Sequence, residues 1–197
     1  MESIVLMETI LSQSRYLIAG GRLSWHFALE EFTMAHESRL TQELRALLHS
    51  HRVAAMGTVN DDGAPFVSMI PYAIEPLLGC LVIHVSGLAA HTANLRMRPQ
   101  VAVLVMHGEM PGESVLALPR VTLQGLAKVP EHDSGYWQKC RAAYLKRFPE
   151  AEPMTQLSDF SFVAIELESA RHVAGFGAAR SIDVDELRLV MAPEEKE

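Results

Sequence analysis

Residues 53–63 read Val-Ala-Ala-Met-Gly-Thr-Val-Asn-Asp-Asp-Gly, a short apolar run that leads into a turn sequence. Asn, Asp and Gly tolerate the backbone angles of tight turns, so we predict that a strand over Val53–Val59 enters a β-hairpin. The returning strand is expected from Phe66 to about Ile74, and a third strand from Cys80 to Val85. Three consecutive strands joined in this way predict an antiparallel meander.

The rest of the chain adds more strands than helices. Four leucines at helical spacing predict an amphipathic helix from Ser38 to His49. We expect further strands over Val101–Met106, Val121–Val129 and Phe160–Glu166 and near His172–Phe176, and further helices after Ser86 as N-cap and over Asp133–Arg147. Strands and helices do not alternate as a doubly wound parallel sheet requires. The predicted fold is therefore mainly β (α+β), an antiparallel barrel with peripheral helices.

Composition narrows the classes of partner. The 197 residues are 49% hydrophobic and 21% charged, which favours one globular domain over a disordered chain. A net charge of −7 opposes attraction to nucleic acid and to anionic membranes, and we predict neither as a partner. Cys80 and Cys140 form no Cys-x-x-Cys pair and no zinc spacing, so we predict no metal centre and a cytoplasmic location.

The two ends of the chain are expected to lie outside the core. Met34 is itself a candidate translation start, and we interpret residues 1–33 as an N-terminal extension. The core domain is predicted over residues 34–190. The charged residues near the C-terminus predict a solvated tail over 191–197.

One segment, Ser86 to Leu95, has the pattern of an anion site. A hydroxyl beside the exposed amides of a helix start favours phosphate, and His91 and Thr92 would add donors from the first turns. The alternative is that Ser86 only caps the helix and His91 is a surface residue.

Three further positions carry both a functional and a structural interpretation. Arg120 heads a strand and is expected near the same barrel mouth, where its guanidinium would suit a phosphate or a ring oxygen; otherwise it is an exposed strand-end charge. In the functional interpretation, the Asp159 carboxylate orients a neighbouring imidazole or water; in the structural one, Asp159 is a turn residue. In the functional interpretation, the neutral imidazole of His172 ligates iron; in the structural one, His172 is a packed or exposed residue without a ligand role.

Motifs of several enzyme classes are absent from the sequence. It contains no Gly-x-Ser-x-Gly, no phosphate-binding Gly-x-x-x-x-Gly-Lys-Ser/Thr, no His-Glu-x-x-His and no Gly-x-Gly-x-x-Gly after a strand. Redox chemistry would therefore need a bound cofactor, because no side chain here transfers hydride.

Several spaced motifs, taken in order, resemble the flavin-binding split barrels related to pyridoxamine 5′-phosphate oxidase, and among them the haem-utilisation branch. The resemblance covers roughly Ser38 to Leu189. Its motifs are Ser86-Gly87-Leu88-Ala89-x-His91-Thr92-x-Asn94-Leu95 with Pro99-Gln100-Val101, Arg120-Val121-Thr122, Asp133-Ser134 with Trp137, Arg147-Phe148, Asp159-Phe160 and Gly175-Phe176-Gly177-x-Ala179.

The resemblance implies a six-stranded split barrel that forms a homodimer, with FMN bound at each edge of the dimer interface. By position, it places the isoalloxazine ring along one strand and the phosphate near a helix start. The implied contacts are Val67, Ser68, Met69 and Ile70 for the ring, Val85 and Ser86 beside the ribityl phosphate, His91 and Thr92 for the phosphate, and Arg120 from the partner region.

Three functions follow as hypotheses. The leading one is a flavin-dependent oxidoreductase acting on an unknown small substrate. The first alternative is a haem-binding or haem-degrading utilisation protein, in which His172 or another residue would replace the C-terminal His that resembles an iron ligand in that branch. The second is a non-catalytic ligand-sensing dimer, because Val67 and Tyr72 stand where oxidase-like members carry Arg and Lys.

Overall fold

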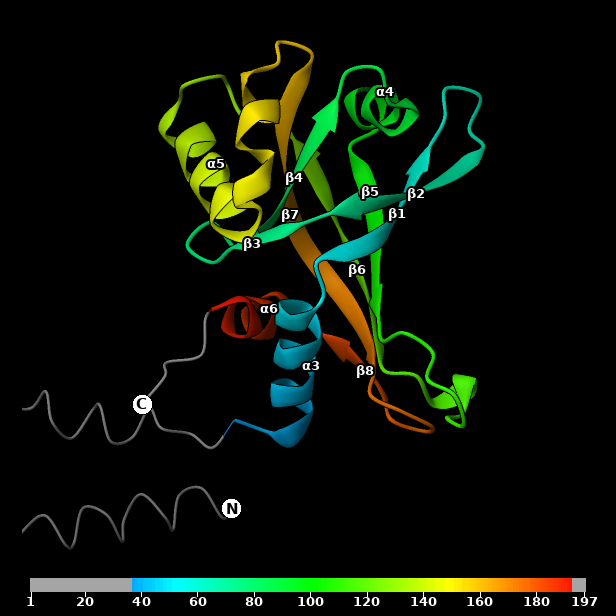
Figure 1. Cartoon of the computed structure of the whole chain (residues 1–197). Coiled ribbons are helices and arrows are strands. Elements are labelled where there is room, and N and C mark those ends of the chain that lie inside the picture. The colour runs from blue at the N-terminus through cyan, green and yellow to red at the C-terminus, as the bar shows by residue number, and fades with distance from the viewer. Residues whose placement is uncertain (1–36, 193–197) are drawn as a thin grey trace, which may run out of the picture. The chain divides into compact units, whose positions relative to one another are not determined.

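A computed structural model describes residues 37–192 of the chain (Figure 1). The predicted extension over residues 1–33 lies outside the described residues, as do residues 193–197. The strands are β1 (Val53–Val59), β2 (Pro65–Pro71), β3 (Ala73–Glu75), β4 (Cys80–Ser86), β5 (Gln100–Met106), β6 (Arg120–Lys128), β7 (Phe160–Val173) and β8 (Ala179–Ile182). The helices are α3 (Arg39–Ser50), α4 (Ala90–Met97), α5 (Gly135–Arg147) and α6 (Val184–Met191), with short 3₁₀ turns η2 (Val115–Ala117) and η3 (Pro149–Gln156).

All strand pairs are antiparallel, and the sheet order is β2-β1-β5-β6-β7-β4-β3, with β8 also pairing with β7. The two edges of this order, β2 and β3, are one extended segment interrupted only at Tyr72. Its first part pairs with β1 and its last part with β4, so the segment joins both edges of the sheet. The sheet therefore curls into the predicted six-stranded split barrel, with β2 and β3 counted as one strand and the short β8 as an addition to β7.

Tyr72 holds this junction in place. Its ring is fully buried, and its hydroxyl donates a hydrogen bond of 2.7 Å to the carbonyl of Leu48 at the end of α3. Its backbone amide donates to the carbonyl of Arg52, which extends the pairing of β2 with the chain just before β1. Burial in this apolar surrounding raises the pKa of Tyr72, so the phenol stays neutral and serves as a donor.

Two apolar clusters lie on opposite sides of the curved sheet. The inner one joins alternate residues of the strands to Leu44, Leu47 and Leu48 of α3, as the helical spacing of these leucines predicts. The second packs α5 on the outside of β3, β4 and β7, and it contains both cysteines as buried free thiols. No helix within residues 37–192 is long and apolar enough to cross a membrane.

The C-terminal elements differ from the prediction. Instead of a separate strand near His172–Phe176, β7 runs unbroken to Val173, a turn follows, and β8 and α6 complete the domain. Helix α6 ends at the buried Met191, one residue beyond the predicted domain boundary. Short elements of this kind lack the repeated period on which a prediction from sequence depends.

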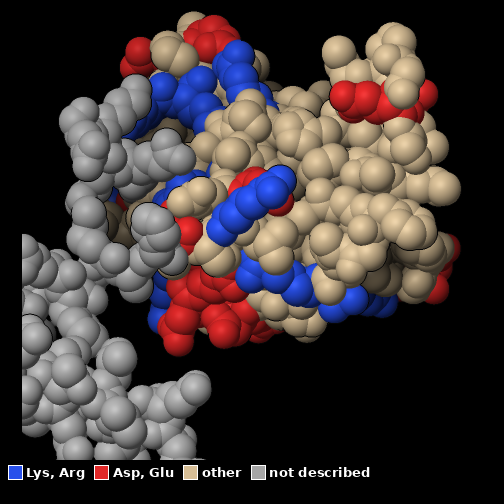
Figure 2. All heavy atoms as spheres, turned by 90° about the horizontal axis from the view of Figure 1, so that it is seen from below, with Lys and Arg blue, Asp and Glu red and all other residues tan. Residues whose placement is uncertain are grey.

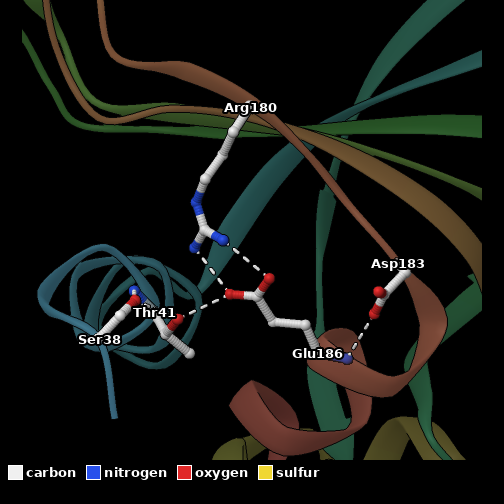
Figure 3. Close-up of polar contacts among 5 residues, drawn as sticks. All are labelled: Ser38, Thr41, Arg180, Asp183 and Glu186. Atoms are coloured by element: carbon white, nitrogen blue, oxygen red, sulfur yellow. Dashed lines mark hydrogen bonds and ion pairs between the residues drawn. The ribbon is translucent and has the colours of Figure 1, made fainter. Parts of the chain in front are cut away.

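A polar contact joins β8, α6 and α3 (Figure 3). Arg180 of β8 binds the Glu186 carboxylate through two nitrogens, each at 2.7 Å, and the Thr41 hydroxyl of α3 donates to the same carboxylate at 2.7 Å. Asp183 caps α6 by accepting from the Glu186 amide.

Viewed from this end of the domain, charged side chains gather on one side, and the side of the 107–118 loop is mostly uncharged (Figure 2).

His172 lies behind this contact and is 1% exposed, and neither ring nitrogen has a hydrogen-bond partner among the described residues. It faces Val121 on β6 and Arg180 on β8. Burial and the charge of Arg180 lower its pKa, against the opposite effects of Glu43 and Glu186. The structure therefore favours the packed interpretation of His172 over an iron ligand.

This burial predicts a loss of stability in acid. Because the pKa of His172 is lower in the folded protein than in the unfolded chain, the unfolded chain binds more protons, and stability falls as the pH drops through the usual histidine range. We expect a slope of up to about 1.4 kcal/mol per pH unit from this group between about pH 7.5 and pH 5.5. Urea unfolding should show a weaker pH dependence for His172→Gln than for the exposed-site control His132→Gln. An equal dependence would contradict the assignment.

Candidate functional site

The outer face of the β2-β1-β5 sheet is apolar and is not covered by any helix of the described domain. Antiparallel register places residues of the three strands in two rows across this face. The rows are Val67–Gly57–Ala102 and Met69–Ala55–Leu104. Val67 is 67% exposed and Met69 is 66% exposed, so two large aliphatic side chains of β2 stand together in water. Small residues form the floor between them.

A cavity of about 340 Å³ opens on this face. We call it the outer-face cavity. Its lining is mostly aliphatic, with His51 and Ser68 as the polar members. The lining residues are His51, Val53, Ala54, Ala55, Val67, Ser68, Met69, Leu104 and Met106. Ser68 lies between the outward-pointing Val67 and Met69, so its hydroxyl points to the other face of β2, where it meets His91. A flat apolar ligand would find an apolar surface here, with His51 as the polar residue.

Cationic side chains stand on the neighbouring strands of the same face. Arg120 is directly opposite Met106, which lines the cavity, and Arg171 is opposite Thr122 in the row that continues from Leu104. One Arg120 nitrogen donates to the carbonyl of Leu118 at 3.0 Å. Its guanidinium therefore lies at the border of the apolar face.

Arg120 is not at the barrel mouth where we expected it. Ser86 pairs with Phe160 at the start of β7, whereas Arg120 pairs with Val173 at its end. Thirteen strand steps of about 3.3 Å put these positions roughly 40 Å apart along β7. Within one chain, Arg120 and the α4 residues cannot contact the same phosphate. The antiparallel direction of β6 causes the separation.

The start of α4 carries a polar cluster different from the predicted cap. The helix N-cap is Ala89, without a side-chain cap, so Ser86 is not the cap we predicted. Ser86 instead donates to Asp159 at 2.9 Å and accepts from the amide of Leu88. Thr92 is buried and donates to the Ser86 carbonyl at 2.6 Å. These bonds occupy both hydroxyls within the fold.

His91 lies beside β2, its Nδ1 3.0 Å from the Ser68 hydroxyl. Partial burial lowers the pKa of His91, so the ring is neutral at neutral pH. A neutral imidazole contributes hydrogen bonds but no charge to this end of the sheet.

Two predicted FMN contacts, Ile70 for the ring and Val85 beside the ribityl phosphate, belong to the core. Ile70 is 2% exposed and Val85 is also buried, because alternate residues of a strand point to opposite faces. Of the four β2 residues, Val67 and Met69 project outward. The structure thus brings Val67, Ser68 and Met69 to the outer-face cavity, puts Arg120 at its border, and leaves Ser86, His91 and Thr92 around α4.

Residues that sequence reasoning missed come from β5 and the end of α3. Leu104, Met106 and His51 all line the outer-face cavity. The alternation of β5, with Val101, Val103 and Val105 buried, indicates in retrospect which of its residues face outward. No sequence pattern identifies His51 as a site residue, because only the register of β1 with β2 and β5 brings the residues around it together.

The chain is similar to proteins of a known family and to two named relatives. The family described as pyridoxamine 5′-phosphate oxidase matches residues 40–174. The chain is 30% identical over 152 residues to heme oxygenase HutZ of Vibrio cholerae, covering 77% of this chain and 85% of that protein. It is 30% identical over 153 residues to the chloroplastic non-canonical heme oxygenase HOZ of Arabidopsis thaliana, covering 74% of this chain and 45% of that protein.

A solved structure supports the same grouping. The heme binding protein from Mycobacterium smegmatis superimposes with a TM-score of 0.68 at 29% identity, over 77% of this chain and 61% of that one. The chain thus spans less than two thirds of that protein and less than half of the Arabidopsis one.

These relatives overturn one expectation. The leading hypothesis, an FMN-dependent oxidoreductase on a small substrate, is wrong, because the similar proteins are named for haem and not for flavin. The fold alone does not identify the cofactor, since one scaffold serves several cofactors. The matched residues and the fold agree on the grouping: this chain belongs to the pyridoxamine 5′-phosphate oxidase family, in its haem-utilisation branch.

Proposed function

We propose that this protein is a homodimeric haem-binding protein that opens the haem ring oxidatively. The observation that carries the proposal is the outer-face cavity, a broad apolar surface with arginines at its border. The names of the relatives point to the same ligand.

The residues of this face fit haem by their chemistry. Haem has a flat apolar macrocycle and two carboxylates. Gly57 and Ala102 in the row of Val67, and Ala55 in the row of Met69, form a low floor on which a planar ring can lie. Arg120 and Arg171 provide planar donor groups of the kind that bind carboxylates through two hydrogen bonds. No acidic residue lines the cavity.

A homodimer is supported by the exposure of this face. Val67 and Met69 would be covered by a second copy, which lowers the cost of leaving large aliphatic groups in water. A second copy is also the means by which Arg120 of one chain and the α4 end of another would serve one ligand, since Arg120 and α4 lie at opposite ends of a single sheet.

Ring opening is the second part of the proposal and is supported by the Vibrio cholerae relative, of which this chain covers 85%. Bound haem supplies the iron centre at which dioxygen reacts, with electrons from an external donor. The chain's own residues would hold the ring and keep bulk water from it. Ser68 with His91, and Ser86 with Asp159, provide hydrogen-bonding groups at the α4 end.

Haemin titration of the full chain tests the binding site. A saturable Soret change is expected, and Met69→Asp should weaken haem affinity tenfold or more, about 1.4 kcal/mol, because it places a charge against an apolar ring. Leu77→Asp changes an exposed leucine in the β3–β4 turn, away from the outer-face cavity, and should leave affinity unchanged. Light scattering should show a dimer for the wild type and for Leu77→Asp.

Equal affinities of the two variants would refute the site, and no saturable binding by the wild type would refute haem and favour the ligand-sensing dimer. For ring opening, the haem complex is mixed with ascorbate in air, with catalase added to remove free peroxide. Loss of the Soret band with release of iron supports degradation, whereas a stable band indicates a carrier.

A further inference from the structure

His51 is the one histidine among residues 37–192 that lines the outer-face cavity. It follows the last residue of α3, and its Nδ1 lies 2.9 Å from the carbonyl of Leu47. A carbonyl only accepts hydrogen bonds, so Nδ1 carries the proton and donates. In the neutral ring Nε2 then holds a lone pair.

Nothing in residues 37–192 hydrogen-bonds to that Nε2, and His51 is one of the residues that line the outer-face cavity. The other side of the ring is supported by His107, whose ring centroid lies 4.8 Å away at an interplanar angle of 72°. His107 in turn is fixed by its amide, which donates to the carbonyl of Pro119. The imidazole is therefore oriented on two sides.

The backbone of His51 is fixed as well. Arg147 of α5 donates from one nitrogen to the carbonyl of His51 and, at 3.0 Å, to that of His49. The next residue, Arg52, binds Glu150 at 2.8 Å and lies over the ring of Phe148. Contacts from α5 and η3 thus hold the turn between α3 and β1.

This is the arrangement that metal-ligating histidines commonly have. One ring nitrogen donates to a backbone carbonyl, which fixes the tautomer and makes the other nitrogen a better donor to a metal. We propose that Nε2 of His51 is the axial ligand of the haem iron, an inference that rests on the proposed haem site. None of the other histidines in residues 37–192 lines the outer-face cavity. Among them, His172 is buried, His91 is paired with Ser68, His132 is paired with Asp133, and Nε2 of His49 lies 3.0 Å from the carbonyl of Val190.

The simpler interpretation is that His51 only satisfies the Leu47 carbonyl at the end of α3. Two substitutions separate the two roles. The amide of His51→Asn can still donate to that carbonyl but is a poor iron ligand, whereas His51→Ala loses both functions. Thermal unfolding should show that His51→Asn remains folded.

Resonance Raman and electron paramagnetic resonance spectra of the haem complex provide the readout. Wild type and His107→Ala should show an iron–imidazole signature, and both His51→Asn and His51→Ala should lose it, with a tenfold or greater fall in haem affinity. Added imidazole should restore the signature in His51→Ala.

A histidine signature that persists in His51→Asn would overturn this inference alone, and so would wild-type haem bound without any imidazole ligand. Both outcomes leave haem binding at the face intact. Absence of saturable haem binding by the wild type would overturn the inference together with the proposed function.

Discussion

Gly125→Ala is expected to lower the free energy of unfolding by about 3 kcal/mol, at the upper end of what overpacking costs. Gly125 lies where the register of β6 and β7 shifts by one residue. A Cβ at this position would lie 3.0 Å from the backbone carbon of Glu166 and still closer to its carbonyl oxygen. Backbone of a central strand cannot move aside as a flexible side chain can.

The bulge matters to the barrel because it bends two of its longest strands. Bulges increase local twist and help a sheet to curl. Displacing β7 at Glu166 would also disturb its pairing with β4, since Cys80 is directly opposite Glu166. The loss of stability should therefore come with a lower cooperativity of unfolding.

Urea unfolding followed by circular dichroism measures this effect. Gly108→Ala is the matched control, because no atom lies within 4 Å of its added Cβ. It should change stability by no more than about 0.5 kcal/mol. Similar values for the two variants would mean that β7 accommodates the methyl group at Gly125.

Glu186→Gln is expected to lower the free energy of unfolding by about 2 kcal/mol. Removing one partner of a buried ion pair costs roughly 3–5 kcal/mol, and we reduce this because the pair is 26% and 22% exposed. The substitution leaves Arg180 without its carboxylate beside buried His172. It also weakens the Thr41 bond that joins α3 to α6 (Figure 3).

The Glu186 carboxylate also predicts that the protein loses stability in acid. Burial by itself raises the pKa of Glu186, but hydrogen bonds from Arg180 and Thr41 and the Arg180 charge outweigh it, so the pKa lies below the usual value. The stabilisation is complete above the unfolded pKa and is lost as the pH falls through the folded one. Glu186→Gln should lack this loss.

Asp185→Asn is the control for Glu186→Gln. Asp185 lies on the same helix and forms an exposed pair with Arg188, so its replacement should cost no more than about 0.5 kcal/mol. A Thr41→Val and Glu186→Gln double-mutant cycle measures the coupling of α3 to α6. Additive effects would show that the two helices are held by apolar packing alone.

Much of the fold was predictable because its signals are local. The turn after Val59 and the short apolar segments of β4, β5 and β6 identified the strands, and the leucine spacing identified α3. The closure at Tyr72 was not predictable, because residues 65–75 read as one strand and nothing local says that the two halves pair with different partners. Helix α6 was missed because eight residues carry too little periodicity.

The candidate site was only partly predictable, for the same reason. The β2 pattern alone separates outward Val67 and Met69 from buried Ile70 once the core face is known. Arg120 was identified as a residue of interest, but its distance from Ser86 depends on the direction and register of β6 and β7.

Periodicity and turn chemistry in the sequence determined most of the strands and helices and a barrel-like sheet. The spaced motifs of the sequence also determined the family resemblance. The tertiary structure alone decided which residues share the outer-face cavity, that His172 is packed away from it, and that His51 points one nitrogen at Leu47 and lines the cavity. The reason is physical: periodicity and turn chemistry act over a few residues, whereas strand register and burial come from contacts between segments distant in sequence.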